Sequence, residues 1–181
     1  MFEEVSRERF RLLSDDELDP QARELLARLP PLNVIRAAAG APSVLPALVE
    51  MAVALLRDTE LPVPEREIAI LRIAHRACSE YVWEQHERFS RLLGIDAGRI
   101  TAVRDGGETD DDRLLCRAAD EVSGGGLGAS TRSELLERFG YRQTTELVLV
   151  LGWFLLITRL VASFDVAIED APAFGAELLD R

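Results

Sequence analysis

The chain has 181 residues, of which 48% are hydrophobic and 6% aromatic, and its formal net charge is −11 at pH 7. This length suggests one domain, and the apolar share is enough for a sizeable core. A surface this acidic repels phosphate backbones and anionic lipids, so we expect neither a nucleic-acid partner nor a membrane partner. Few aromatic residues and many alanines and leucines favour helices over strands.

Apolar spacing and helix-end signals predict an all-α fold of seven to nine helices. Ser43 and Ser79 are the expected N-caps, Thr131 is expected to open a capping box, and Gly94 and Gly140 are expected stops. The predicted helical segments, in chain order, are 15–29, 32–39, 44–58, 65–77, 80–93, 96–103, 112–122, 132–139 and 145–164.

These segments suggest a main helical domain over 32–165, preceded by a helical extension over 1–31 and followed by an acidic, loosely ordered tail over 166–181. The N-terminal stretch MFEEVSRERFRLL mixes both charges and has no apolar run, so we do not expect it to act as a secretory signal. The most apolar segment, 147–158, is shorter than the roughly 20 residues that a bilayer requires, which predicts a buried helix. The expected location is the cytoplasm.

The chain contains two cysteines and two histidines. Cys78 and Cys116 have no framework spacing, so we expect reduced thiols. No three ligand-quality residues follow metal spacing, and the glycine run 124–128 lacks the strand that precedes a nucleotide loop. We therefore expect no metal and no cofactor.

One face of the predicted helix over 80–93 carries a histidine. Ser79, Val82, His86, Phe89 and Leu93 step by three or four residues and share this face, which is mostly small or apolar and should point inward. An interior histidine must be hydrogen-bonded. His86 is therefore either a satisfied core residue or a general base in an apolar pocket.

The segment REIAILRIAHRACSEYVWEQHERFSRLLGI, 66–95, resembles the carboxymuconolactone decarboxylase family, which includes the alkylhydroperoxidase D-like proteins. The shared pattern is R-E, an apolar helix, then S-E-Y-x-W-x-x-H and a helix that ends in L-G. The resemblance implies an all-helical domain that acts on a small-molecule substrate and forms a homo-oligomer, as a dimer, trimer or hexamer.

Peroxidase members of that family use C-x-x-C-x-x-x-H and an upstream glutamate. Counting back from His86 places these cysteines at Ser79 and Val82 and the glutamate at Glu67. The glutamate and histidine match, whereas both cysteines are missing. Cys78 lies one residue from a redox position, which is about 100° of rotation on a helix.

The resemblance implies that His86 and Glu67 form the catalytic pair of a non-redox lyase, isomerase or decarboxylase. Glu67 would hold the tautomer of His86, which would move a proton next to the carbonyl of a small carbonyl or lactone acid. The expected substrate-binding residues are Ser79, Tyr81, Val82, Trp83, His75 and Arg159.

Two other functions stay open: a thiol peroxidase that uses Cys78, and a non-catalytic oligomer that binds a ligand. Structural roles also stay open for individual residues. Glu67 could lie in the first turn of its helix and interact favourably with the helix dipole. Ser79 could be only an N-cap, and Trp83 could belong to the core.

Overall fold

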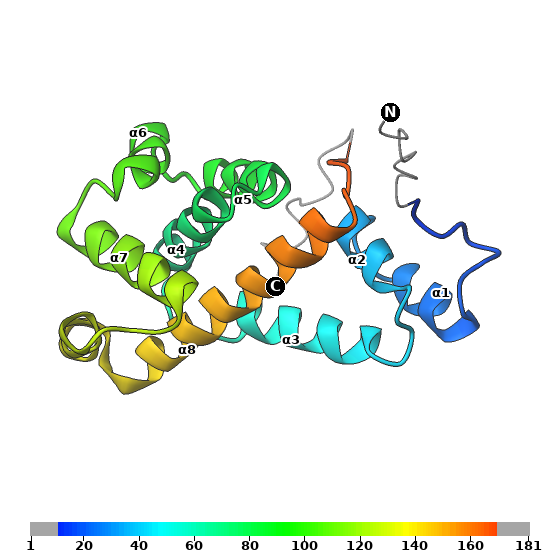
Figure 1. Cartoon of the computed structure of the whole chain (residues 1–181), viewed down its shortest axis with the longest axis horizontal. Coiled ribbons are helices and arrows are strands. Elements are labelled where there is room, and N and C mark those ends of the chain that lie inside the picture. The colour runs from blue at the N-terminus through cyan, green and yellow to red at the C-terminus, as the bar shows by residue number, and fades with distance from the viewer. Residues whose placement is uncertain (1–10, 170–181) are drawn as a thin grey trace, which may run out of the picture.

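The computed structural model describes residues 11–169. Most of the predicted acidic tail and of the N-terminal stretch lies outside this range. The described residues form eight α-helices and a short 3₁₀ helix, with no β-strand, which confirms the all-α prediction (Figure 1). The helices are α1 Pro20–Leu26, α2 Asn33–Ala38, α3 Leu45–Arg57, α4 Val63–Arg76, α5 Glu80–Leu92, α6 Ala97–Ala102, η1 Val103–Asp105, α7 Asp110–Gly124 and α8 Ala129–Ser163.

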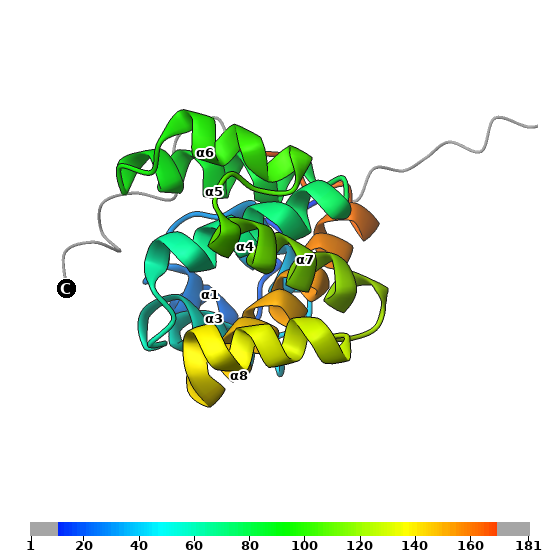
Figure 2. The same cartoon turned by 90° about the vertical axis from the view of Figure 1, so that its left-hand side faces the viewer.

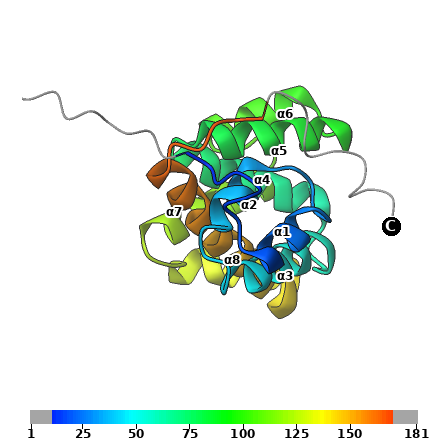
Figure 3. The same cartoon turned by 90° about the vertical axis from the view of Figure 1, so that its right-hand side faces the viewer.

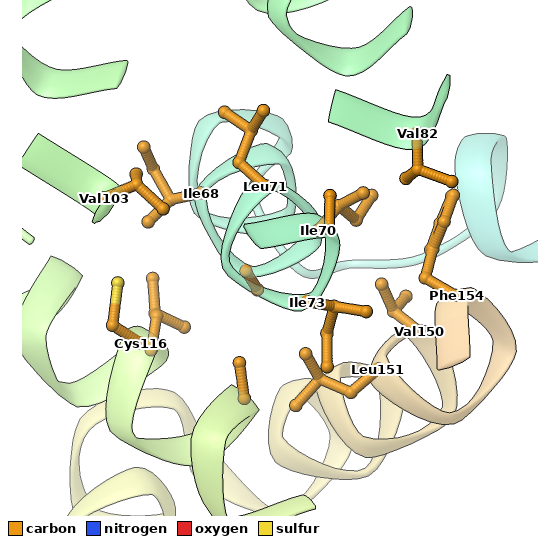
Figure 4. Close-up of a cluster of buried hydrophobic side chains, with 14 of the residues drawn as sticks. Ile68, Ile70, Leu71, Ile73, Val82, Val103, Cys116, Val150, Leu151 and Phe154 are labelled. Atoms are coloured by element: carbon orange, nitrogen blue, oxygen red, sulfur yellow. The ribbon is translucent and has the colours of Figure 1, made fainter. Parts of the chain in front are cut away.

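Helix α4 is the centre of the molecule. It lies between α5 and α6 on one side and α8 on the other, with α7 beside it (Figure 2). Its apolar residues Ile68, Ile70, Leu71 and Ile73 are fully buried. Because they point in several directions around the helix, they contact side chains from η1, α5, α7 and α8 (Figure 4). A helix that is apolar around most of its circumference is stable only when it is enclosed in this way.

The first three helices lie together at one end of the molecule (Figure 3), and a second, smaller core joins them. Leu18, Ala22, Ala39 and Leu45 are buried there, and α1 packs against α3. Asp19 caps α1 by accepting hydrogen bonds from two backbone amides of its first turn. This cluster positions α2 and α3 opposite α8.

Among the predicted helix ends, those at Ser79 and Gly94 are confirmed and those at Ser43 and Thr131 are wrong. Ser79 caps α5 through its side chain, and Gly94 follows α5 with a φ of 78°. Ser43 is not an N-cap, because α3 is preceded by Val44 and its cap makes no side-chain hydrogen bond. Thr131 is not an N-cap either.

The N-terminus of α8 explains the error at Thr131. The helix begins earlier, at Ala129 after Gly128. Thr131 therefore lies inside the first turn, where its hydroxyl donates to Glu121 Oε1 at 2.7 Å and accepts from Arg117 Nε at 3.1 Å. The hydroxyl joins α8 to α7 instead of capping its own helix.

Gly140 interrupts the helical backbone of α8, as predicted, and two helical segments meet there at a kink. Its φ of 73° and ψ of 176° are not helical, and the chain re-enters a helix directly after it. The positive φ is a conformation that glycine adopts without strain. The sequence predicted two helices separated by a short linker, whereas the structure joins them at this kink.

The second half of α8 is unusually apolar. Over its best 18 residues the mean hydropathy is 1.9, so α8 is the one helix in residues 11–169 that is long and apolar enough to cross a membrane. The core helix of a globular protein meets the same criterion. Here 39% of that window is buried, and residues such as Val150 and Leu151 pack on α4 (Figure 4).

Candidate functional site

A cavity of about 360 Å³ is lined by residues of α2, α3, α5, α8 and the segment after α1. This volume is within the range of ligand pockets, about 300–1,000 Å³. All but five of the lining residues are apolar, and the exceptions are Arg28, Arg57, Tyr81, Gln85 and His86. The cavity is thus mostly apolar. Its few polar side chains are three residues of α5 and two arginines.

His86 lies in the wall of this cavity and contacts Glu67 of α4. Its Nδ1 is 2.7 Å from Glu67 Oε2, and the ring of Phe154 packs edge-on against the imidazole at a centroid distance of 4.7 Å. Only 4% of His86 is exposed and Glu67 is fully buried. The structure therefore brings together the two residues that the family resemblance paired.

Arg66 completes this buried group. Its Nε and Nη2 each donate to Glu67 Oε1 at 3.3 Å, and its Nη1 donates to the backbone oxygen of Leu56 at 2.6 Å. Only 3% of Arg66 is exposed. A buried carboxylate needs a counter-charge or several donors, and here Arg66 supplies the charge while His86 supplies a further donor. The R-E pair was visible in the sequence, but its arginine was not predicted to belong to the site.

The contact with Glu67 determines which nitrogen of His86 is basic. A carboxylate oxygen only accepts hydrogen bonds, so a neutral imidazole must carry its proton on Nδ1. Nε2 then carries the lone pair that can accept a proton, and the carboxylate stabilises the imidazolium that results.

The dipole explanation for Glu67 does not hold. Helix α4 begins at Val63, two residues earlier than the sequence suggested, and the acidic residue of its first turn is Glu65. Glu67 is the fifth residue of α4 and lies past its first turn, where the dipole contributes little. Its contacts with His86 and Arg66 account for its position.

Tyr81 and Gln85 lie one turn apart on α5, and both line the cavity. Glu169, which follows α8, accepts from the Tyr81 hydroxyl at 2.5 Å, from the Asn33 backbone amide at 2.5 Å and from Gln85 Nε2. Burial, followed by the hydrogen bond to Glu169, raises the pKa of Tyr81 far above its usual range. Tyr81 is therefore a neutral phenol that fixes α5 to the segment after α8. Gln85 and Glu169 were not predicted as site residues.

The remaining predicted binding residues divide into two groups. Val82 lines the cavity, whereas the described lining does not include Ser79, Trp83, His75 or Arg159. Ser79 is the N-cap of α5, and Arg159 is exposed on α8.

Trp83 of α5 and His75 of α4 pack against each other. Trp83 is buried, its Nε1 donates to Glu87 Oε2 at 2.5 Å, and the guanidinium of Arg104 lies 3.9 Å from the ring centroid. His75 packs edge-on against Trp83 at 6.4 Å. Partial burial, followed by the charges of neighbouring arginines, lowers the pKa of His75. These contacts support a structural role for both residues.

Both cysteines are free thiols, as predicted. Cys78 is exposed in the turn between α4 and α5, where its φ is 52°, and it is not among the described residues that line the cavity. Cys116 is buried in α7, and burial raises its pKa to about 12. A protonated, enclosed thiol is a poor nucleophile. Within residues 11–169, no group of three His, Cys, Asp or Glu side chains could hold a metal ion.

The solved structures that share this fold include two peroxidase-related proteins. One is described as an alkylhydroperoxidase AhpD core, an uncharacterized peroxidase-related protein from Ralstonia eutropha JMP134; it has a TM-score of 0.76 and 17% identity, over 92% of this chain and 94% of that one. The other, an uncharacterized peroxidase-related protein from Silicibacter sp. TM1040, has a TM-score of 0.68 and 20% identity, over 87% and 90% of the two chains. No family model and no curated protein matches the chain.

Proposed function

The protein has an alkylhydroperoxidase D-like helical fold, and on this fold we propose that it is a non-redox, carboxymuconolactone decarboxylase-like enzyme. It acts as a lyase, isomerase or decarboxylase by moving a proton at a carbon next to a carbonyl group. His86 is the catalytic base and Glu67 is the residue that positions it. The observation that carries this proposal is the 2.7 Å contact between His86 Nδ1 and Glu67 Oε2 in the wall of an apolar cavity.

The proposed step uses the tautomer that Glu67 imposes. Nε2 of His86 takes the proton from the substrate carbon, the electron pair of that C–H bond forms a C=C bond, and the π pair of the carbonyl moves onto its oxygen to give an enolate. The imidazolium, stabilised by Glu67, then returns the proton to the same or a neighbouring carbon. The lining is mostly apolar, so the charges of the transition state interact more strongly there than they would in solution.

Exchange of carbon-bound protons for deuterium in heavy water tests this step. We would follow pyruvate, levulinate and a long-chain oxo acid by NMR with wild type, His86→Gln and His75→Gln. Losing a general base slows proton transfer by about 10²–10⁴-fold, so His86→Gln should lose the enzyme-dependent exchange. His75→Gln is the matched control and should keep it. Equal exchange with wild type and His86→Gln would contradict the proposal.

A thiol peroxidase remains the second candidate. The two similar structures named above are described as peroxidase-related, and the Cys78 thiol is exposed. This function requires peroxide consumption with dithiothreitol that is lost in Cys78→Ser and kept in His86→Gln. A protein that binds a ligand in the cavity and shows neither activity would be the non-catalytic oligomer.

We also propose that the chain forms a homo-oligomer. Several large apolar side chains of α3 and α8 are exposed, among them Met51, Leu136, Leu149 and Leu156. Helices with apolar residues on their outer face are stable in water when a second copy covers them. Light scattering after gel filtration should give the mass of a dimer, trimer or hexamer, and a mass near 20.1 kDa would contradict this.

A further inference from the structure

We propose that the substrate of this cavity is an amphiphilic carboxylate, with its apolar body along α3 and its anionic head at Arg57. The inference rests on the proposed function for the reaction only, because the binding itself is measurable without turnover. The proposed substrate is larger and more apolar than the small carbonyl or lactone acid that the family resemblance implies.

The shape of the cavity supports an extended apolar body. Its lining residues on α3 run from Leu45 to Arg57, which is about 18 Å along a helix axis. Leu48, Val49 and Ala52 lie between those two ends. The facing residues of α8 are Trp153, Phe154, Ile157 and Leu160. A small polar acid would leave most of this wall without an apolar partner.

The charge of the cavity supports an anionic head. Arg28 and Arg57 are the two charged side chains in the lining, and Arg28 pairs with Glu24 one turn before it. Arg57 is exposed and makes no salt bridge with any residue in the described part of the chain. A carboxylate would give Arg57 a partner and form a charge-assisted hydrogen bond.

Hydrogen bonds connect the C-terminal end of α3, where Arg57 lies, to the proposed catalytic pair. The carbonyl of Leu56 accepts a hydrogen bond from Arg66, which in turn contacts Glu67 beside His86. A head group at Arg57 therefore places the adjacent carbons toward the His86 end, and the apolar body toward Leu45. The position of Arg57 in the last turn of α3 also suits the helix dipole, but the dipole does not explain why the side chain lines the cavity.

Calorimetric titration with hexanoate, octanoate and decanoate, and with their methyl esters, tests the ligand class. Each added methylene buried in the cavity should strengthen binding by about fourfold. Each carboxylate should bind about tenfold or more tightly than its ester, because the ester loses the charge-assisted bond. Arg57→Gln should abolish this preference and Arg57→Lys should retain part of it, whereas Arg159→Gln is the surface control and should change nothing.

A pair of alanines on α3 locates the binding. Ala52 lines the cavity, while Ala54 is exposed on the same helix and is not in the described lining. Ala52→Trp should fill the chamber and weaken octanoate binding by at least about tenfold, and Ala54→Trp should not. Quenching of Trp153, which lines the cavity, gives a second readout.

Three results would overturn the inference: no binding, binding that is independent of chain length, or equal binding of acid and ester in wild type. His86→Gln separates this inference from the proposed function. If His86→Gln and wild type bind octanoate equally and neither catalyses exchange, the ligand class stands and the reaction fails. If exchange of levulinate depends on His86 while octanoate does not bind, the reaction stands and the ligand class fails.

Discussion

Replacing Glu67 with glutamine tests the buried group most sharply, because the change removes a charge and almost no volume. Glu67 is fully buried and Arg66 is 3% exposed, so Glu67→Gln leaves the guanidinium in the core without its counter-charge. Breaking a buried ion pair from one side costs about 3–5 kcal/mol. Because a typical domain has only about 5–15 kcal/mol of stability, the loss should be large.

Urea unfolding followed by circular dichroism measures this cost. We expect the free energy of unfolding to fall by about 3–5 kcal/mol and the melting temperature to fall by about 10 °C. Glu65→Gln on the same helix is the matched control, because its carboxylate is partly exposed and lies 4.0 Å from Arg99, so it should cost less than about 1 kcal/mol. Adding Arg66→Met to Glu67→Gln should recover part of the loss. A loss below about 1 kcal/mol in Glu67→Gln would refute the reasoning.

Three further outcomes follow from the structure. In thiol titration near neutral pH, Cys78 should react in the folded protein, and Cys116 only after unfolding, because burial raises its pKa to about 12. Burial acts to raise the pKa of Asp112, which lies in the first turn of α7. Hydrogen bonds from Arg99 and from the backbone of Thr109, the N-cap of α7, outweigh burial and lower this pKa. The resulting stability is complete above the unfolded pKa and is lost as the pH falls through the folded pKa, so Asp112→Asn should flatten the acid side of a stability-against-pH profile. Gly140→Ala forces a side chain onto a φ of 73° and should lower the free energy of unfolding by about 1 kcal/mol in urea titration.

Local patterns were sufficient to predict the helices but not all of their ends. The apolar spacing of α4 and α5 and the cap at Ser79 depend on neighbours in the sequence, and the structure confirms them. The prediction at Thr131 was wrong because α8 begins at Ala129, directly after Gly128. Thr131 therefore lies inside the helix and does not cap it. At Gly140 the residue type predicted a helix stop, but it did not show that the next helix would begin at once.

The candidate site could be predicted only in part. Glu67 and His86 were paired by a resemblance, since nothing in their spacing shows that two helices bring them within 2.7 Å. Glu169 is 88 residues from Tyr81, so no local signal pointed to their hydrogen bond. Arg57 and the apolar wall of α3 belong to the site only because tertiary packing places α3 opposite α5 and α8.

The tautomer of His86 is the measurement that tests the central claim most directly. Long-range proton–nitrogen NMR separates a protonated from an unprotonated ring nitrogen, and the chain has only two histidines, so His75→Asn leaves a single imidazole signal. With the ring neutral, we expect the proton on Nδ1 and the lone pair on Nε2, and we expect Glu67→Gln to weaken this preference. A proton on Nε2 in the wild type would show that Glu67 does not hold His86 as a base toward the cavity.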